Sequence, residues 1–341
     1  MRIGVIAATY GEPAINSFAE QWIYSYRILA RLTRKIAPIP KPVLPIIATA
    51  RARGRVKLWN ENGFASPLEK LHEQTLAALR SELAARGMAD AVVVPAYEFR
   101  RPNLSDALRT LRKQGCDRAV VVPMYVADGD FTHGMTRLAV EDAMSEGAWT
   151  NPEHLSFCAI TEDEPTTERL VSVLAGHCLS SAHARGVPEP AKDWALMLAA
   201  HGTVITPPPG VDNGLLHAGK VLLRLKHALK PHFGLVRIGW LNHTRGGKWS
   251  TPAVADALDW VRERGFTKLV YYPWGFTTDN AETLLEGRVA LAEMSSPFER
   301  VEHLECMNAY EPFVKLLADR LGEHVDRIKA GGRAQPAASA A

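Results

Sequence analysis

The chain has 341 residues, of which 47% are hydrophobic and 23% are charged, and its formal net charge is +3. This length suits one large domain or two ordinary domains with a substantial core, and so small a charge does not indicate a nucleic-acid partner. The cysteines are scattered, the N-terminus lacks a signal-peptide pattern and no apolar run reaches about 18 residues, which predicts a reducing, cytoplasmic setting and excludes a bilayer-spanning helix.

Short runs rich in Val, Ile and Leu alternate with longer helical patterns, which predicts an α/β fold with Rossmann-like, doubly wound parallel sheets. The expected strands are 2–9, 90–97, 118–126, 155–161, 194–200, 234–241, 267–274 and 299–306. The expected helices are 16–36, 67–87, 103–114, 133–146, 166–185, 213–230, 253–264, 280–294 and 310–328. Residues 331–341 are small and weakly hydrophobic, which predicts a disordered tail, and their lack of cysteine argues against a C-terminal iron–sulfur cluster.

The segment 102–123 has a counterpart at 252–273 without a gap in the spacing. Each copy starts with proline, continues through a helical pattern and a glycine, and ends in an apolar run closed by proline. The simplest explanation is a chain of two similar α/β halves, 1–150 and 151–330, with a ligand cleft between them.

A local basic stretch is formed by Arg51, Arg53, Arg55 and Lys57. The favoured interpretation is a solvated edge strand or loop. A weaker alternative assigns these cations to the carboxylates of an acidic small molecule.

Two sets of residues recur at helical spacing near the N-terminus: Phe18, Trp22, Tyr26 and Leu29 are apolar, and Arg27, Arg31 and Arg34 are basic. Core packing is the default explanation of the apolar set. The alternative is a helix that forms the apolar lip of a cleft for a flat ligand and contacts a membrane surface through its arginines. Tyr10 could reach the same cleft as an oxygen ligand or donor, or could cap the sheet.

Two polar residues follow apolar runs that are expected to be strands. His201 comes directly after 194–200, and Glu282 follows 267–274 after a short turn. The carboxyl ends of parallel strands open onto the ligand crevice of an α/β protein. An imidazole and a carboxylate facing each other there could take protons from a bound ligand and pass a metal to it.

Further carboxylates accompany Glu282. Glu286 and Glu293 follow at helical spacing, and Asp279 is expected at the mouth of the site. A solvated helix surface explains such a row about as well as a functional one does. A functional row of hard oxygen ligands would suit a divalent cation in transit better than a fixed structural metal.

Several other kinds of site are not supported. No G-x-G-x-x-G follows a strand, and Gly246-Gly247-Lys248 is followed by Trp249 instead of Ser or Thr, so no nucleotide cofactor is expected. The chain also lacks a G-x-S-x-G elbow and the histidine spacings of zinc enzymes.

The motifs resemble those of the ferrochelatase family, whose members insert ferrous iron into a porphyrin. His201-Gly202 resembles the family's S-x-H-G-x-P segment, and 273–286 resembles its P-x-G-F-x-x-D-H-x-E-T-L-x-E signature. Further matches are Tyr10-Gly11-Glu12-Pro13, Ser66-Pro67-Leu68, Trp249 with Pro252, and Met307-Asn308 with Pro312-Phe313. The resemblance runs from residue 2 to about residue 325 in the family's order.

This resemblance implies a lyase of haem biosynthesis with porphyrin and Fe²⁺ as substrates and no nucleotide. The implied catalytic residues are His201 and Glu282; the implied metal ligands are these two with Asp279 and Glu286; the implied substrate contacts are Tyr10, Trp22, Tyr26 and Trp249. His201 and Glu282 are expected either on opposite sides of the ring or on one side.

The chain departs from the family pattern at three places. Leu241-Asn242-His243 replaces the family's Q-S-R segment, Asn280 stands where histidine is usual, and Ala290 interrupts the row of acids. These departures leave two alternatives open. One is a chelatase for a more carboxylated tetrapyrrole, coproporphyrin or sirohydrochlorin, with iron or cobalt; Tyr10 before Gly11 favours the coproporphyrin branch. The other is a non-catalytic haem or porphyrin carrier.

Overall fold

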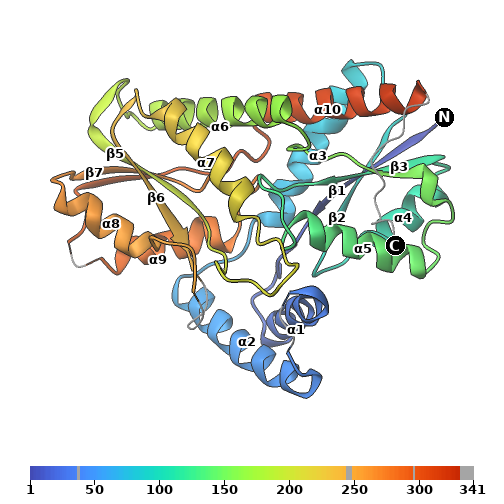
Figure 1. The fold of residues 1–341 in the computed structure, drawn as a ribbon, viewed down its shortest axis with the longest axis horizontal. Coiled ribbons are helices and arrows are strands. Elements are labelled where there is room, and N and C mark those ends of the chain that lie inside the picture. Colours follow the sequence, from blue (N-terminus) through green and yellow to red (C-terminus); the bar gives the residue numbers. More distant parts are fainter. Residues whose placement is uncertain (37–38, 243–247, 295, 331–341) are drawn as a thin grey trace. The chain divides into compact units, whose positions relative to one another are not determined.

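The computed structural model describes the chain except residues 37–38, 243–247, 295 and 331–341. The expected tail, and His243 of the Leu241-Asn242-His243 segment, therefore lie outside the described residues. The chain forms two compact α/β units, Met1–Glu162 with Ala309–Ala341, and Asp163–Asn308 (Figure 1).

The first unit contains a parallel sheet of order β2-β1-β3-β4. Its strands are β1 (Ile3–Thr9), β2 (Val92–Tyr97), β3 (Arg118–Pro123) and β4 (Leu155–Phe157). Its helices are α1 (Phe18–Lys35), η1 (Lys41–Val43), α2 (Leu44–Glu61), α3 (Leu68–Ala85), α4 (Leu104–Lys113), α5 (His133–Ser145), η2 (Pro152–His154) and α10 (Glu311–Lys329). Helices α3 and α10 pack together, while α4 and α5 bury apolar side chains against the sheet.

The second unit repeats this topology with a parallel sheet of order β6-β5-β7-β8. Its strands are β5 (Ala191–His201), β6 (Phe233–Leu241), β7 (Lys268–Tyr272) and β8 (Arg300–His303). Its helices are α6 (Glu164–Ala184), α7 (Leu215–Leu229), α8 (Val254–Glu263), η3 (Glu282–Glu286) and α9 (Gly287–Ala292). Helices α6 and α7 pack together, and α8 and α9 cover the opposite face of the sheet (Figure 1).

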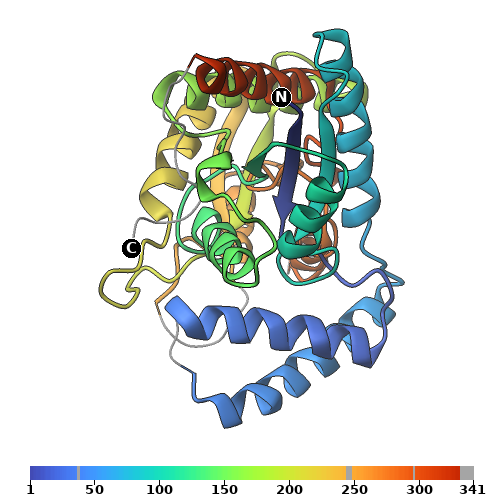
Figure 2. The same cartoon turned by 90° about the vertical axis from the view of Figure 1, so that its right-hand side faces the viewer.

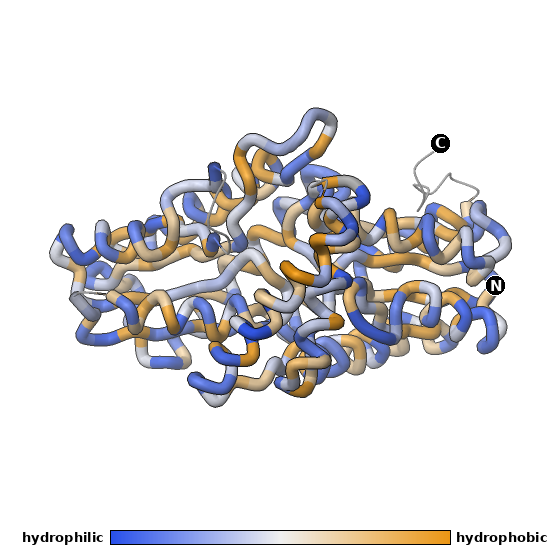
Figure 3. Tube along the Cα trace, turned by 90° about the horizontal axis from the view of Figure 1, so that it is seen from below, coloured by the Kyte–Doolittle hydropathy of each residue, from blue (hydrophilic) through white to orange (hydrophobic). Residues whose placement is uncertain are grey.

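The strands and the helices bury different proportions of their residues. In β5, residues 194–200 are buried without interruption, as expected for a strand covered on both faces. The helices alternate between hydrophilic and hydrophobic stretches because one face of each packs on its unit (Figure 3). The prediction of two similar parallel α/β units is confirmed, since the sheet orders become identical when each strand number of the first is raised by four.

Three local expectations differ from the structure. Residues 51–57 lie in the α-helix α2, not in an edge strand or loop, and α2 runs beside α1 (Figure 2). The helix expected at 280–294 opens with a π-helical turn, η3. Helix α10 belongs to the first unit, whereas the expected boundaries of 1–150 and 151–330 assigned it to the second half.

Candidate functional site

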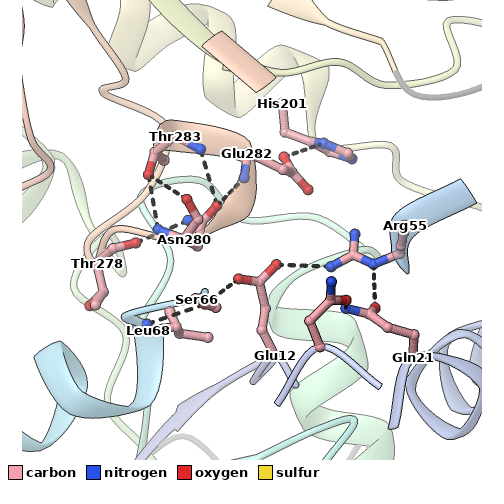
Figure 4. A network of polar contacts seen from close by, with 11 residues as sticks. Glu12, Gln21, Arg55, Ser66, Leu68, His201, Thr278, Asn280, Glu282 and Thr283 are labelled. Carbon is pink, nitrogen blue, oxygen red and sulfur yellow. Dashed lines mark hydrogen bonds and ion pairs between the residues drawn. The ribbon is translucent and has the colours of Figure 1, made fainter. Parts of the chain in front are cut away.

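His201 and Glu282 lie together at the carboxyl end of the second unit's sheet. The central strand β5 ends on His201, and Glu282 begins the π-helix that follows the neighbouring strand β7. His201 Nδ1 and Glu282 Oε2 are 3.0 Å apart (Figure 4). The His201 side chain is 44% exposed and that of Glu282 is 19% exposed.

The pairing fixes the chemistry that each group can perform. A carboxylate accepts hydrogen bonds, so Nδ1–H of His201 donates to Glu282, and in the neutral ring Nε2 is then the nitrogen that carries the lone pair. Because much of the imidazole is exposed, a ligand can approach it. A carboxylate at this distance can also stabilise positive charge on the neighbouring ring.

Asn280 caps the segment that carries Glu282. Its Oδ1 accepts from the backbone N–H groups of Glu282 at 2.8 Å and Thr283 at 3.2 Å. Thr283 Oγ1 accepts from the Asn280 N–H at 2.9 Å, which completes a reciprocal cap (Figure 4). Asn280 is fully buried. The residue that departs from the family pattern thus satisfies backbone donors at the start of the turn.

Asp279 is buried, with 1% of its surface exposed, and does not lie at the mouth of the site as expected. Its Oδ1 accepts from Thr283 Oγ1 and from the Cys306 N–H, both at 3.0 Å. Its Oδ2 accepts from Asn308 Nδ2 at 2.7 Å. The Asp279 carboxylate therefore already accepts three hydrogen bonds from protein donors.

Gly287, directly after the π-helical turn, packs closely against Tyr271. A Cβ atom there would lie 2.9 Å from the Tyr271 hydroxyl, so glycine allows the turn to approach the buried ring. Glu286, at the end of the turn, is half-buried, while Glu293 is exposed. Single π-turns inside helices are frequent at functional sites because they redirect side chains.

The four expected metal ligands do not form one cluster. Among the described residues, no three His, Cys, Asp or Glu side chains converge as they would around a bound ion. His201 and Glu282 are paired, Asp279 is turned into the protein and Glu286 lies four residues beyond Glu282. This arrangement differs from a resident metal site.

A partly buried histidine, His303, contacts the backbone of the same turn. His303 Nε2 donates to the Thr283 carbonyl oxygen at 2.7 Å. Burial lowers the pKa of His303 to about 4. The imidazole is therefore neutral near pH 7 and can hold its single N–H on the carbonyl.

Of the four expected substrate contacts, two lie together on α1 and the other two lie in loops. Trp22 and Tyr26 stack on α1 with ring centroids 5.2 Å apart, and Trp22 Nε1 donates to Thr49 Oγ1 of α2 at 3.0 Å. Packing between α1 and α2 thus accounts for part of their burial. The Tyr10 carbonyl accepts from the Phe99 N–H at 3.0 Å. Trp249 is half-buried in the second unit and forms a β-bridge with Val204.

In the first unit, a buried network occupies the loop after β1. Glu12 is 2% exposed, accepts from Ser66 Oγ at 2.6 Å and pairs with Arg55 Nη2 at 3.4 Å (Figure 4). Arg55 Nε also donates to Gln21 Oε1 at 2.8 Å. The network was missed because α2 was not predicted, although the spacing of Ala48, Ala52 and Trp59 is helical.

Two residues of the basic stretch 51–57, Arg55 and Lys57, interact with residues of the first unit. Arg55 lies over the Tyr24 and Trp59 rings at 5.0 and 5.1 Å. Lys57 pairs with Glu61 one turn later on the surface. Both cations therefore have partners inside the first unit.

Comparison with known proteins identifies the family. The family model described as Ferrochelatase matches residues 2–325. A ferrochelatase of Synechococcus elongatus is 21% identical over 330 residues, covering 96% of this chain and 83% of its own. One of Aliivibrio fischeri is 25% identical over 333 residues, covering 93% and 96%.

A solved structure supports the fold. SirB from Bacillus subtilis with Fe³⁺ superposes with a TM-score of 0.55 at 12% identity, covering 97% of this chain and 98% of that one. No described helix is both long and apolar enough to cross a membrane. The match of the family model over almost the whole chain, together with the strand-end pair of His201 and Glu282, means that this chain belongs to the ferrochelatase family.

Proposed function

We propose that this protein is a ferrochelatase that inserts ferrous iron into a porphyrin, protoporphyrin IX or coproporphyrin III, in haem biosynthesis. The observation that carries the proposal is the His201–Glu282 pair, 3.0 Å apart at the carboxyl ends of β5 and β7. Family membership supports the reaction type.

Metallation requires two pyrrole N–H protons to leave and a cation to lose water as it approaches the ring nitrogens. In the proposed mechanism, Nε2 of His201 takes a pyrrole proton while Glu282 stabilises the resulting imidazolium through Nδ1–H. In the alternative step, Nε2 ligates the incoming iron and does not take the proton, because it has a single lone pair; Glu282 assists in either case with an oxygen donor. The second pyrrole proton leaves to solvent. Both groups act from the same side, so proton removal and metal delivery are linked.

Glu286 is proposed to deliver iron to this pair. It lies at the far end of the same π-turn as Glu282 and keeps a partly exposed carboxylate. Carboxylates are hard ligands that exchange divalent cations readily. The sequence grouped Asp279 with these ligands, but its burial and three donors favour a supporting role.

The substrate contacts remain proposals. Tyr10, Trp22, Tyr26 and Trp249 are proposed to contact the macrocycle, because aromatic faces bind flat apolar rings. The stacked, half-buried pair of Trp22 and Tyr26 supports this assignment.

A second candidate is a chelatase for another tetrapyrrole, sirohydrochlorin, with iron or cobalt. The observation that favours it concerns Asn242, in the segment that replaces Q-S-R. Asn242 Nδ2 donates to the Ser250 carbonyl, and its Oδ1 would lie 1.8 Å from a Cβ at Gly202. Asn242 thus packs beside the His201 loop, where it supports different substrate contacts from those of the family.

A contact with a membrane surface from the cytoplasm is also proposed. Several apolar side chains on α1, on α2 and in the loop before α1 are exposed: Ile15, Phe18, Ile23 and Ile46. The expected basic contact is weakened because Arg31 and Arg34 both pair with Asp142. Flotation with lipid vesicles tests this contact, and equal flotation of the I15S/F18S/I46S variant would reject it.

The deciding experiment is an anaerobic assay of the purified protein with Fe²⁺ and each porphyrin, and with sirohydrochlorin and Fe²⁺ or Co²⁺, followed by absorbance. We expect iron insertion into protoporphyrin IX or coproporphyrin III and its loss in Glu282→Gln. Faster turnover of sirohydrochlorin would favour the second candidate. A tight porphyrin complex without metallation would indicate the non-catalytic carrier.

A further inference from the structure

Asn308 occupies an unusual backbone position beside the site. Its φ of 48° is the only positive value of a non-glycine residue within the described part of the chain. Asparagine tolerates this left-handed conformation better than most residues do. The Asn308 N–H donates to the Thr277 carbonyl at 2.8 Å, so the turn is attached to the segment that leads to Glu282.

The Asn308 side chain makes a reciprocal pair with Asp279. Nδ2 of Asn308 donates to Asp279 Oδ2 at 2.7 Å, and Oδ1 of Asn308 accepts from the Asp279 backbone N–H at 3.0 Å. An amide can satisfy both contacts because it carries a donor and an acceptor. The two hydrogen bonds fix the orientation of the Asp279 carboxylate.

The second oxygen of Asp279 transmits this orientation to the catalytic turn. Oδ1 accepts from Thr283 Oγ1 at 3.0 Å, and Thr283 follows Glu282 directly in η3. The Thr283 carbonyl is held from the other side by His303 at 2.7 Å. The residue next to Glu282 is therefore anchored through its side chain and through its backbone.

We propose that Asn308 and Asp279 form a positioning pair that holds the Glu282 carboxylate against His201, and that Asp279 does not ligate iron. The proposal rests on the proposed function for its kinetic consequence. A carboxylate that is 1% exposed and accepts three hydrogen bonds is poorly placed to receive a hydrated cation. Small displacements of a catalytic group, on the order of 1 Å, lower rates by up to about 100-fold.

The first test separates the backbone of Asn308 from its side chain. Asn308→Gly keeps the left-handed conformation and removes both amide hydrogen bonds. We expect kcat to fall by about 10-fold or more, in line with the cost of misplacement, while KM for the porphyrin changes by less than about threefold. Asn62→Gly is the matched control, because Asn62 bonds a carbonyl on the surface of the first unit. A wild-type kcat in Asn308→Gly would overturn the proposal.

The second test exchanges the two side chains. Asn308→Asp places two carboxylates face to face and Asp279→Asn places two amides face to face, so each single variant should lose activity. In the double variant the new amide at position 279 donates to the new carboxylate at position 308 and keeps an oxygen for Thr283 and Cys306, so the hydrogen bonds are restored. We expect kcat to recover to within about threefold of wild type, since the geometry is recovered. A double variant as slow as Asp279→Asn would mean that the carboxylate itself is needed at position 279, and would overturn the proposal.

Hydrogen exchange of residues 277–287 provides a readout that does not need activity. Exchange should be faster in both single variants and return to the wild-type rate in the double variant. If the wild-type protein metallates no porphyrin, the proposed function fails, and these exchange rates still decide whether the pair holds the turn. Unchanged exchange in all variants would overturn the positioning role. If the double variant does not fold, Asn308→Gly decides alone.

Discussion

The two units share one topology but use the carboxyl end of the central strand differently. In the first unit, the loop after β1 carries Glu12, which is 2% exposed and tied to Arg55 and Ser66. In the second unit, β5 ends on His201, which is 44% exposed and pairs with Glu282. One carboxylate is buried inside a network and the other stands beside an accessible base.

The partner of each carboxylate explains the difference in chemistry. A guanidinium keeps its proton at any ordinary pH, so Arg55 cannot act as a base toward a ligand, and its pair with the buried Glu12 is expected to stabilise the first unit. An imidazole nitrogen can accept a proton or bind a metal ion, which a guanidinium cannot do, so the His201–Glu282 pair is the one proposed to take part in catalysis. The carboxyl edge of the sheet therefore carries a structural ion pair in the first unit and the proposed catalytic pair in the second.

The largest effect should come from removing the reactive base. His201→Ala should lower iron insertion by about 10² to 10⁴-fold, because a positioned acid–base group contributes that much. His232→Ala is the matched control, since His232 pairs with Glu189 at 2.8 Å on the surface of the same unit. Initial rates at matched folding measure both. Equal rates of iron insertion in His201→Ala and His232→Ala would contradict the view that the second unit carries a catalytic base.

Breaking the structural pair should affect stability. Arg55→Met removes a cation from the buried Glu12, which should lower the free energy of unfolding by about 3–5 kcal/mol. Lys57→Met, two residues away on α2, breaks an exposed pair and should cost about 0.5 kcal/mol or less. Denaturant unfolding measures both variants. Similar losses in the two would show that burial of Glu12 is not the cause.

Buried histidines should affect both units in the same way. Burial lowers the pKa of His72 in the first unit and of His177 in the second to about 4. In the unfolded chain these imidazoles take up a proton near pH 6.5, whereas in the folded protein they do so only near pH 4. Their contribution to the free energy of unfolding is therefore complete above pH 6.5 and is lost as the pH falls toward 4.

Replacing either histidine by glutamine should therefore flatten the acid dependence of stability. The unfolding free energy of each variant, compared with wild type, should improve by about 2.5 kcal/mol at most between pH 7 and pH 4.5. Chemical denaturation at the two pH values measures the change. A difference from wild type that is constant with pH would contradict the assignment.

The smallest effect on stability is expected from the contact between helices α1 and α2, which lie between β1 and β2 in the chain. Thr49→Val removes the acceptor of Trp22 Nε1 and should cost about 1 kcal/mol. Ser81→Ala removes an exposed hydroxyl of α3 and should change stability by less than about 0.5 kcal/mol. Thermal unfolding compares them. A neutral Thr49→Val would leave apolar packing as the main contact between α1 and α2.

Much of the fold could be predicted because parallel strands buried on both faces appear as continuous apolar runs, as in residues 194–200. Helix α2 was missed because its buried positions include small alanines at Ala48 and Ala52 among arginines. The unit to which α10 belongs could not be predicted, since helical periodicity does not specify the sheet that a helix covers.

The proximity of His201 and Glu282 was predictable because one ends a parallel strand and the other follows the neighbouring strand after a turn. The site was not predictable where tertiary packing decides. The π-turn depends on the contact of Gly287 with Tyr271, and the burial of Asp279 depends on Asn308, which lies 29 residues later. Local patterns do not contain such contacts.

Because the chain returns to the first unit through α10, the first unit is completed only at the end of protein synthesis. The second unit is one continuous stretch inserted into the first, which is interrupted between Glu162 and Ala309. During translation, residues 163–308 are synthesised before α10, so α3 stays without its helical neighbour until the end of the chain is made. A released chain that ends before residue 309 would therefore contain the whole second unit and a first unit without α10.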